Sequence, residues 1–155
     1  MENMDIGNPA PDFTMSTDTA GEISLRGLAG QKFVLYFYPK DDTPGCTKEA
    51  IGFTESAAEF EKLGVQVIGV SKDTIAKHAK FRTKHNLSVL LASDEDGTTC
   101  EAFGVWVEKN MYGRKYMGIE RATFLVDGEG VLRSIWRKVK VKGHVEAVLA
   151  AAADL

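Results

Sequence analysis

The chain has little of what marks secreted or membrane proteins, with two cysteines in 155 residues and no long hydrophobic run. Two cysteines cannot form the disulfide framework of a small secreted domain. The acidic, polar residues 1–5 are followed by no apolar stretch of the length that a signal peptide or a membrane span requires. We therefore expect a cytoplasmic protein, in which a cysteine is by default a small buried apolar residue.

The chain also lacks an excess of basic residues, since 19 lysines and arginines face 22 aspartates and glutamates and leave a net charge of −3. This balance gives no reason to expect nucleic acid or an anionic membrane as a partner. The basic run at residues 137–142 is local, and we expect it to be a solvated strand edge or helix entry. Repeats and linkers are missing as well, so residues 1–155 are expected to form a single domain, long enough for a full hydrophobic core.

The hydrophobic pattern predicts alternating strands and helices, followed by a hairpin and a final helix. Strands are expected at residues 14–25 (a hairpin), 32–38, 65–71, 89–92, 121–126 and 131–136, helices at 47–63, 73–85, around Cys100 and at 143–153, and an irregular segment at 105–118. Ser71 or Asp73 is the expected N-cap of the helix at 73–85. Its inner side is expected to carry Ala76, Ala79 and Phe81. This order indicates an α/β fold with a mixed central sheet and helices on both faces.

Cys46 stands where a strand is expected to end and a helix to begin. The aromatic, apolar run at 32–38 predicts a buried strand, and Pro39 ends it because proline cannot donate to a strand ladder. The helix that follows places Cys46 near its first turn, where free backbone N–H groups and the helix dipole favour an anion. A thiol in this position is biased towards the thiolate, which is its nucleophilic form.

The neighbours of Cys46 favour a reactive sulfur. Thr43 offers a hydroxyl that can donate and accept, and Gly45 lets the backbone come close to whatever meets the sulfur. No aspartate or histidine lies near enough in sequence to be an obvious base, so activation requires a distant cation. The best candidate is Arg121, because the start of its strand can lie beside the end of an antiparallel neighbour. An exposed arginine at a strand edge remains the alternative.

Residues 39–46, PKDDTPGC, fit the Pro-x-x-x-Thr-x-x-Cys motif of the peroxiredoxins, and residues 36–50 closely resemble the bacterioferritin-comigratory-protein type, also called the Q type. Further similar segments at 7–13, 69–73, 91–94, 103–106 and 120–128 extend the resemblance over essentially the whole chain. The resemblance implies a thioredoxin-like fold and a thiol-dependent peroxidase that serves antioxidant defence. It implies neither a metal nor an organic cofactor.

The resemblance also implies roles for particular residues. Cys46 is expected to be the peroxidatic cysteine, whose thiolate attacks the peroxide and becomes a sulfenic acid. Thr43 is expected to hydrogen-bond the peroxide, and Arg121 to stabilise the thiolate and the charge on the leaving oxygen. Pro39 is expected to shield the site, while the backbone N–H groups of Cys46 and Gly45 complete a polar pocket for the substrate.

The sequence departs from the family pattern at the resolving cysteine. Many similar proteins carry it five residues after the peroxidatic one, where this chain has Ile51, and others carry it in the helix expected here at 73–85, which has none. Cys100 is the only other sulfhydryl, and we expect it to be structural, with a resolving role as the minority alternative. This favours a one-cysteine mechanism in which glutathione, glutaredoxin or thioredoxin reduces the sulfenic acid.

The sequence also bears on three functions other than a peroxidase. A disulfide oxidoreductase needs Cys-x-x-Cys, but Thr43 stands three residues before Cys46. Metal binding through His78 and His85 is disfavoured by their seven-residue spacing, so both are expected to be solvated surface residues. A redox-responsive binding protein or holdase remains open as an added role. A monomer is expected, since no interface pattern stands out.

Overall fold

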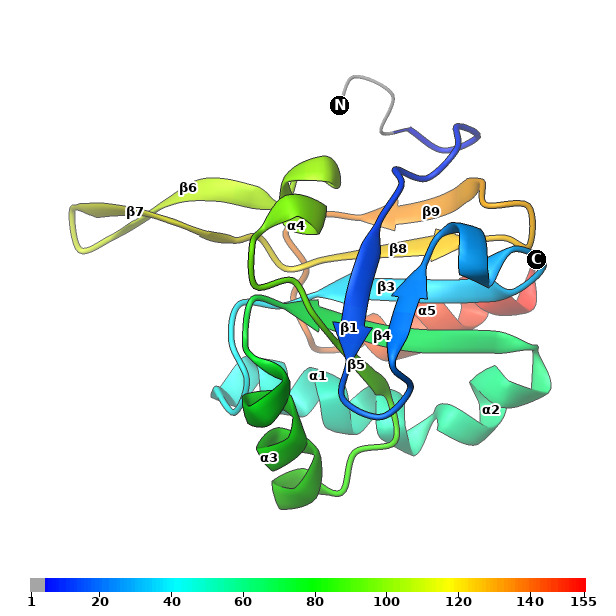
Figure 1. Cartoon of the computed structure of the whole chain (residues 1–155), viewed down its shortest axis with the longest axis horizontal. Coiled ribbons are helices and arrows are strands. Elements are labelled where there is room, and N and C mark those ends of the chain that lie inside the picture. Colours follow the sequence, from blue (N-terminus) through cyan, green and yellow to red (C-terminus); the bar gives the residue numbers. More distant parts are fainter. Residues whose placement is uncertain (1–4) are drawn as a thin grey trace.

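A computed structural model describes residues 5–155, so the expectation for the polar N-terminus lies largely outside the described residues. Seven strands form one sheet in the order β2-β1-β5-β4-β3-β8-β9 (Figure 1). They are β1 (Thr14–Thr17), β2 (Glu22–Ser24), β3 (Lys32–Phe37), β4 (Val65–Ser71), β5 (Leu90–Ser93), β8 (Ala122–Val126) and β9 (Leu132–Trp136). Because β3, β4 and β5 run parallel while β8 runs antiparallel to β3, the predicted mixed sheet is confirmed.

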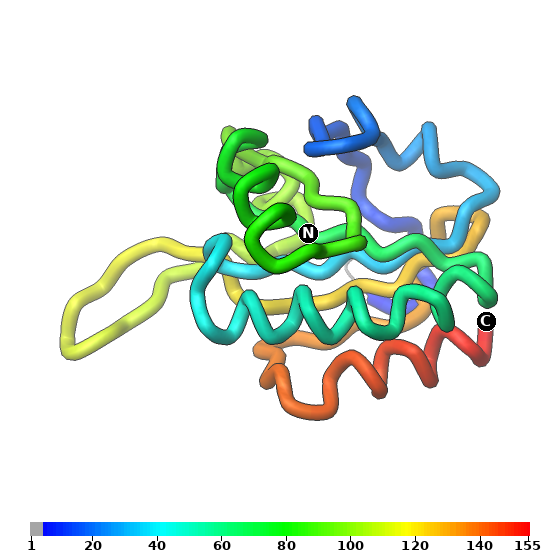
Figure 2. The backbone as a smooth tube through the Cα atoms, turned by 90° about the horizontal axis from the view of Figure 1, so that it is seen from below, coloured from blue at the N-terminus to red at the C-terminus, as the bar shows by residue number. Residues whose placement is uncertain are grey.

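The two faces of the sheet have separate cores. The helices are α1 (Pro44–Glu55), α2 (Ala57–Lys62), α3 (Ile75–His85), α4 (Thr98–Ala102) and α5 (His144–Ala153), with a short 3₁₀ turn η1 (Arg26–Leu28). α1, α2, α3 and α5 pack on the face that holds Cys46, which we call the Cys46 face (Figure 2). α4 packs on the opposite face together with residues 10–15 and with Cys100, and this is the Cys100 face. Helices on both faces are therefore confirmed.

The strand β3 shows how the sequence divides these cores. Val34 and Tyr36 belong to the Cys46 face, whereas Phe33, Leu35 and Phe37 belong to the Cys100 face. Such alternation is the consequence of side chains that point to opposite sides of a strand. Since both sides are buried, the strand reads as one continuous apolar run.

Two expected helices differ from the prediction at their ends. The helix expected at 47–63 begins at Pro44, a residue whose fixed φ suits the first helical position, and it is interrupted at Ser56. α3 begins at Ile75, and its N-cap is Thr74, whose hydroxyl accepts a hydrogen bond from the N–H of Lys77 at 3.2 Å. The prediction of Ser71 or Asp73 as N-cap was therefore wrong.

The prediction for the inner side of α3 was also partly wrong. Phe81 is buried as expected, but Ala76 and Ala79 are exposed and His78 is fully buried. The helix is rotated so that the histidine, rather than the alanines, faces the body of the protein. Its polar partners, described below, make this rotation possible.

The segment expected to be irregular at 105–118 is a hairpin of two strands, β6 (Trp106–Met111) and β7 (Arg114–Ile119). It forms a sheet of its own that projects from the body of the molecule (Figure 1). The pattern missed it because most of its residues are exposed on both faces, so no alternation of apolar and polar residues marks it.

Within the described residues, no helix has the length and apolar character needed to cross a membrane.

Candidate active site

Cys46 lies in the first turn of α1 and its side chain is almost fully buried. Nη2 of Arg121 donates a hydrogen bond to its Sγ at 3.3 Å. The contact follows from the sheet register, because Phe37 at the end of β3 pairs with Ala122 at the start of antiparallel β8. Arg121 therefore comes to lie beside the helix start, which confirms the predicted meeting of Cys46 and Arg121.

Glu49 completes this contact and was missed by the sequence reasoning. Its Oε1 accepts a hydrogen bond from Nη1 of Arg121 at 2.7 Å, so the guanidinium bridges Glu49 and Cys46. The Glu49 side chain has no exposed surface, and its Oε2 has no hydrogen-bond partner within residues 5–155. Burial raises the pKa of Glu49 to about 7, although the charge and hydrogen bond of Arg121 oppose the rise.

A signal for Glu49 exists in the sequence. Residues 46, 49, 50 and 53 follow the i, i+3, i+4, i+7 spacing of one helix face, and all four are buried. An acidic residue on that face requires a partner, because a buried carboxylate without one is costly. The spacing therefore predicts that a cationic side chain packs against the face of the helix that carries Cys46.

Gly45 is the residue over which the guanidinium lies. A Cβ placed there would be 3.1 Å from Nη2 of Arg121, which is tighter than most contacts of this kind. The backbone at Gly45 does not have a positive φ, so space rather than conformation favours glycine. This supports the expectation that Gly45 allows a close approach to the sulfur.

We expect Gly45→Ala to slow the oxidation of Cys46 by peroxide about tenfold, because displacement of the guanidinium weakens a preorganised charge contact. The free energy of unfolding should change by less than about 1 kcal/mol, since the helix preference of alanine offsets the strain placed on the Arg121–Glu49 pair. Stopped-flow oxidation and urea unfolding measure the two effects. Lys48→Ala, at an exposed position of the same helix, is the control and should change neither. An unchanged oxidation rate in Gly45→Ala would contradict this reading of the contact.

Two other predicted site residues, Thr43 and Pro39, have no hydrogen bond to the sulfur within residues 5–155. The hydroxyl of Thr43 donates to the carbonyl of Lys40 at 2.9 Å, and Pro39 is exposed. Within residues 5–155, no hydrogen bond joins the Thr43 hydroxyl to Sγ of Cys46. The structure thus brings Cys46, Gly45 and Arg121 together, while the roles expected of Thr43 and Pro39 stay predictions.

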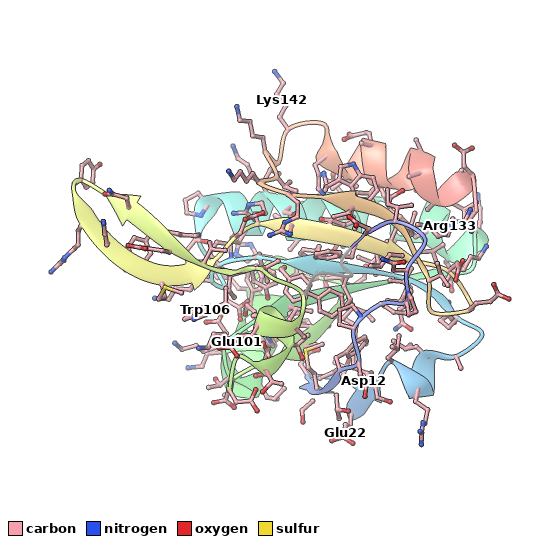
Figure 3. All side chains as sticks on the ribbon, turned by 90° about the horizontal axis from the view of Figure 1, so that it is seen from above. Asp12, Glu22, Glu101, Trp106, Arg133 and Lys142 are labelled. Atoms are coloured by element: carbon pink, nitrogen blue, oxygen red, sulfur yellow. The ribbon has the colours of Figure 1, made fainter. Side chains whose placement is uncertain are left out.

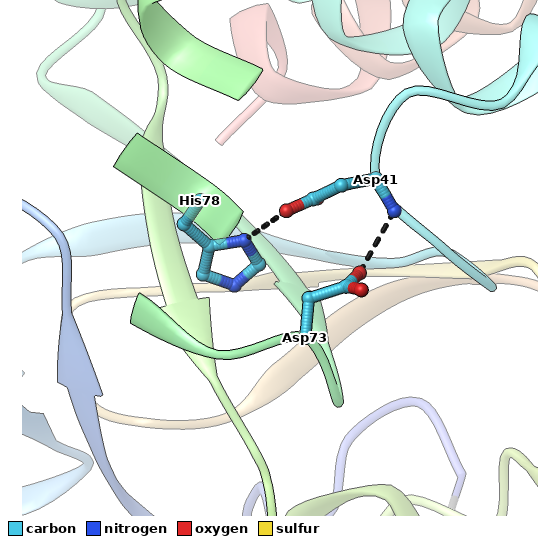
Figure 4. Close-up of side chains that lie close together, drawn as sticks. All are labelled: Asp41, Asp73 and His78. Carbon is cyan, nitrogen blue, oxygen red and sulfur yellow. Dashed lines mark hydrogen bonds and ion pairs between the residues drawn. The ribbon is translucent and has the colours of Figure 1, made fainter. Parts of the chain in front are cut away.

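The loop that precedes Cys46 is tied to α3 by a buried ion pair between Asp41 and His78 (Figure 4). Nδ1 of His78 lies 2.7 Å from Oδ2 of Asp41, and its Nε2 lies 2.9 Å from the carbonyl oxygen of Ala92. The carbonyl oxygen of Ala92 can only accept, so Nε2 of His78 donates to it. Burial alone would lower the pKa of His78, but the hydrogen bond and charge of Asp41 outweigh it and raise the pKa. The expectation that His78 is a solvated surface residue was wrong.

Asp41, Asp73 and His78 bring their ligand atoms within 4.8 Å of one another, which raises the question of a metal ion. These atoms are already engaged, since Oδ2 of Asp73 accepts from the backbone N–H of Asp41 at 2.8 Å and the two His78 nitrogens are hydrogen-bonded to Asp41 and to the Ala92 carbonyl. The geometry therefore favours a hydrogen-bonded brace of the loop. His85 pairs separately with the exposed Asp42 at 2.9 Å, so the two histidines do not share a site.

Cys100 lies fully buried in the core of the opposite face of the sheet. A disulfide requires Cα atoms within about 7 Å, whereas the sheet separates Cys100 from Cys46. Burial raises the pKa of the Cys100 thiol well above its usual range, and the neighbouring Asp94 carboxylate raises it further. Both observations favour the expectation that Cys100 is structural.

Comparison with known proteins agrees with this geometry. The sequence matches the AhpC/TSA family over residues 6–135. It is 53% identical over 147 residues to the putative peroxiredoxin Bcp of Coxiella burnetii, covering 95% of this chain and 97% of that protein. It is 49% identical over 152 residues to the peroxiredoxin Bcp of Bacillus subtilis, covering 98% and 97%.

A solved structure of the Xanthomonas campestris bacterioferritin comigratory protein, studied for its alkyl peroxide reduction activity, is also similar. It superposes with a TM-score of 0.87 at 46% identity, covering 92% of this chain and 90% of that one. This match confirms the predicted thioredoxin-like fold.

Proposed function

Because the chain belongs to the AhpC/TSA family and is a thiol-dependent peroxidase of the peroxiredoxin Bcp type, we propose that Cys46 is its peroxidatic cysteine. The thiolate attacks one oxygen of the hydroperoxide, so that an S–O bond forms while the O–O bond breaks. Cys46 becomes a sulfenic acid, and the second oxygen leaves and takes up a proton as water or an alcohol. The contact of 3.3 Å between Arg121 Nη2 and Cys46 Sγ carries this proposal.

The other site residues act on the two ends of the breaking bond. Arg121 stabilises the thiolate and the negative charge that develops on the leaving oxygen, because its guanidinium is held in place before the reaction. Glu49 is a positioning residue that fixes the orientation of this guanidinium through the bond at 2.7 Å. Thr43 turns its hydroxyl from Lys40 to the bound peroxide, and Gly45 gives the substrate backbone N–H contact. Pro39 limits the access of water.

The cycle closes with an external thiol. One thiol attacks the sulfenic acid and releases water, which leaves a mixed disulfide on Cys46, and a second thiol attacks that disulfide and restores the thiolate. Ile51 occupies one expected resolving position, and Cys100 lies on the opposite face of the sheet. A thiol reductant follows from the thiol-dependent peroxidase activity of the family, and the one-cysteine cycle is our extension of it to this chain.

Intact-mass spectrometry after one equivalent of hydrogen peroxide tests this cycle on the wild type and on Cys100→Ser. We expect both proteins to gain one oxygen on Cys46 and to lose it when thiol is added, since no second cysteine captures the sulfenic acid. With excess peroxide and no thiol, a second oxygen should follow, because the sulfenic acid stays exposed to further oxidation. A loss of two hydrogens in the wild type alone would instead make Cys100 the resolving cysteine.

The substrate class is hydrogen peroxide together with organic hydroperoxides. Alkyl peroxide reduction is the activity studied in the Xanthomonas campestris relative, and the same chemistry applies to either substrate because only the leaving oxygen differs. We further propose that the protein acts as a cytoplasmic monomer that needs no metal or organic cofactor.

A further inference from the structure

The hairpin of β6 and β7 leaves the body beside the active site. β7 ends at Ile119, two residues before Arg121, and the hairpin extends away from the sheet (Figures 1 and 2). A hairpin of two strands is marginally stable in water by itself. Its outer part nevertheless exposes Met111, Tyr112, Tyr116 and Met117, with Tyr112 fully accessible to solvent. Such an exposed apolar group at the edge of an active site is typical of an interaction surface.

The register divides the hairpin into two faces with different charge. Paired residues share a face, so Lys109, Met111, Arg114 and Tyr116 lie on one side, which we call the Lys109 face. On that face Lys109 pairs with Tyr116 and Met111 pairs with Arg114, without any carboxylate. The other side, the Lys115 face, is formed by residues 106, 108, 110, 115, 117 and 119. There the ammonium of Lys115 lies 3.9 Å from Glu108, so its charge is balanced.

At the base of the hairpin, Trp106 and Ile119 of the Lys115 face pack on the core of the Cys100 face, so the Lys109 face is turned away from that core. The side chain of Lys109 lies over Gly118, where an added Cβ would be 3.2 Å from it, and so it runs towards the base of the hairpin. Burial and the nearby charge of Arg121 lower the pKa of Lys109, and Cys46 acts on it in the opposite sense. Lys109 therefore shares the electrostatic field of the active site.

A second basic segment flanks the same site. The run at 137–142 follows β9, and the N–H of Val139 donates to the carbonyl of Arg121 at 2.9 Å, which holds the run beside the catalytic arginine. Lys138, Lys140 and Lys142 are exposed, and Figure 3 shows Lys142 pointing outward.

The nearby carboxylates do not offset these charges. Glu120 is bound by Arg137 at 2.9 Å, and Glu49 by Arg121 at 2.7 Å. Within residues 5–155, neither Lys109 nor Arg114 has a carboxylate at ion-pair distance. We call Lys109, Arg114, Lys138, Lys140 and Lys142 the basic rim. It is cationic on a chain whose net charge is −3.

We propose that the basic rim and the Lys109 face of the hairpin dock an acidic protein thiol, the reductant that restores Cys46. This rests on the proposed one-cysteine cycle, in which a second protein must bring its thiol to the sulfur. Cationic groups around the site steer an acidic partner, while Met111 and Tyr116 supply apolar contact once it arrives. A small contact suits a transient complex that must dissociate after each transfer.

Adjacent residues of β7 provide a matched test, because Arg114 lies on the Lys109 face and Lys115 on the other. With a reduced thioredoxin of acidic pI as the probe, we expect Arg114→Glu to raise the KM for thioredoxin about fivefold at low ionic strength. Lys115→Glu should change it less than about twofold, because its face does not meet the partner. Added salt should shrink the effect of Arg114→Glu, since the Debye length falls to about 3 Å at 1 M. Tyr116→Ser and Met117→Ser repeat the comparison for apolar contact.

Turnover with dithiothreitol, which is uncharged and small, separates docking from chemistry. It should be equal in the wild type and in all four variants. Equal effects of Arg114→Glu and Lys115→Glu on the KM for thioredoxin would overturn the docking proposal, although the peroxidase would stand. A dimer that Arg114→Glu dissociates in sedimentation would also overturn it, because the face would then bind a second copy. Absence of turnover with both reductants in the wild type would instead overturn the proposed function.

Discussion

Replacement of Cys46 by serine is expected to abolish peroxide-dependent thiol oxidation, with a loss of at least about a thousandfold. The hydroxyl has nearly the same shape and can still accept the hydrogen bond that Arg121 now donates to the sulfur at 3.3 Å. It remains un-ionised at a helix start and is a poor nucleophile towards the O–O bond. The rate of peroxide consumption with dithiothreitol measures the loss, and urea unfolding shows whether the fold is kept.

Cys100→Ser is the matched control, since it makes the same change on the opposite face of the sheet. Activity should stay within about twofold of the wild type, while a hydroxyl in that apolar core costs roughly 1–3 kcal/mol of unfolding free energy. A Cys46→Ser protein that still consumes peroxide would refute the assignment of the nucleophile. A Cys100→Ser protein that fails to turn over with every thiol donor tested would require a two-cysteine cycle.

The features that the sequence predicted correctly share a local origin. The continuous apolar run before Pro39 marks a strand buried on both sides, and the helix pattern after it places Cys46 at a helix start. The start of β8 beside the end of β3 follows from antiparallel pairing, so the meeting with Arg121 was within reach of the same reasoning. Each of these inferences uses residues that are adjacent in sequence or paired by a simple rule of sheet topology.

The features that were missed depend on partners distant in sequence. His78 reads as a polar residue of a solvated helix, and its burial depends on Asp41, 37 positions away, and on the Ala92 carbonyl, 14 positions away. Glu49 likewise needs Arg121, 72 positions away. The hairpin of β6 and β7 was missed for a different reason, because backbone pairing rather than burial of one face holds it together, and hydrophobic patterning does not detect such strands.

Removal of Arg121 is expected to have the second largest effect. It should lower both the stability of the fold and the oxidation rate of Cys46, and the buried Glu49 allows these two effects to be measured separately. Arg121→Met leaves the Glu49 carboxylate without its cation at a position with no exposed side-chain surface. Breaking a buried pair in this way costs about 3–5 kcal/mol of unfolding free energy at neutral pH. The oxidation rate of Cys46 should also fall by about a hundredfold or more, because the charge on the leaving oxygen loses its stabilising group.

The pH dependence of the unfolding free energy identifies the first effect, which is the loss of the cation that pairs with Glu49. The pKa of Glu49 in the folded protein, about 7, lies above its ordinary value of 4.5, so the folded state binds more protons in this range. The contribution of Glu49 to stability therefore falls as the pH rises from 4.5 to 7 and is constant above that. In Arg121→Met the folded pKa is higher still, and the decline should continue beyond pH 7. Urea unfolding at pH 5 and pH 8 measures the difference, which should be larger in the variant.

The double variant Arg121→Met with Glu49→Gln separates folding from catalysis. Glutamine does not titrate, so the unfolding free energy should be higher than in Arg121→Met. Position 49 should then contribute nothing to its pH dependence in this range. The oxidation rate should stay as low as in Arg121→Met, because the guanidinium is still missing. Glu49→Gln alone keeps the guanidinium beside the sulfur and should retain most of the activity. If the double variant instead regains the wild-type oxidation rate, Arg121 serves only to neutralise Glu49, and the catalytic role proposed for it is wrong.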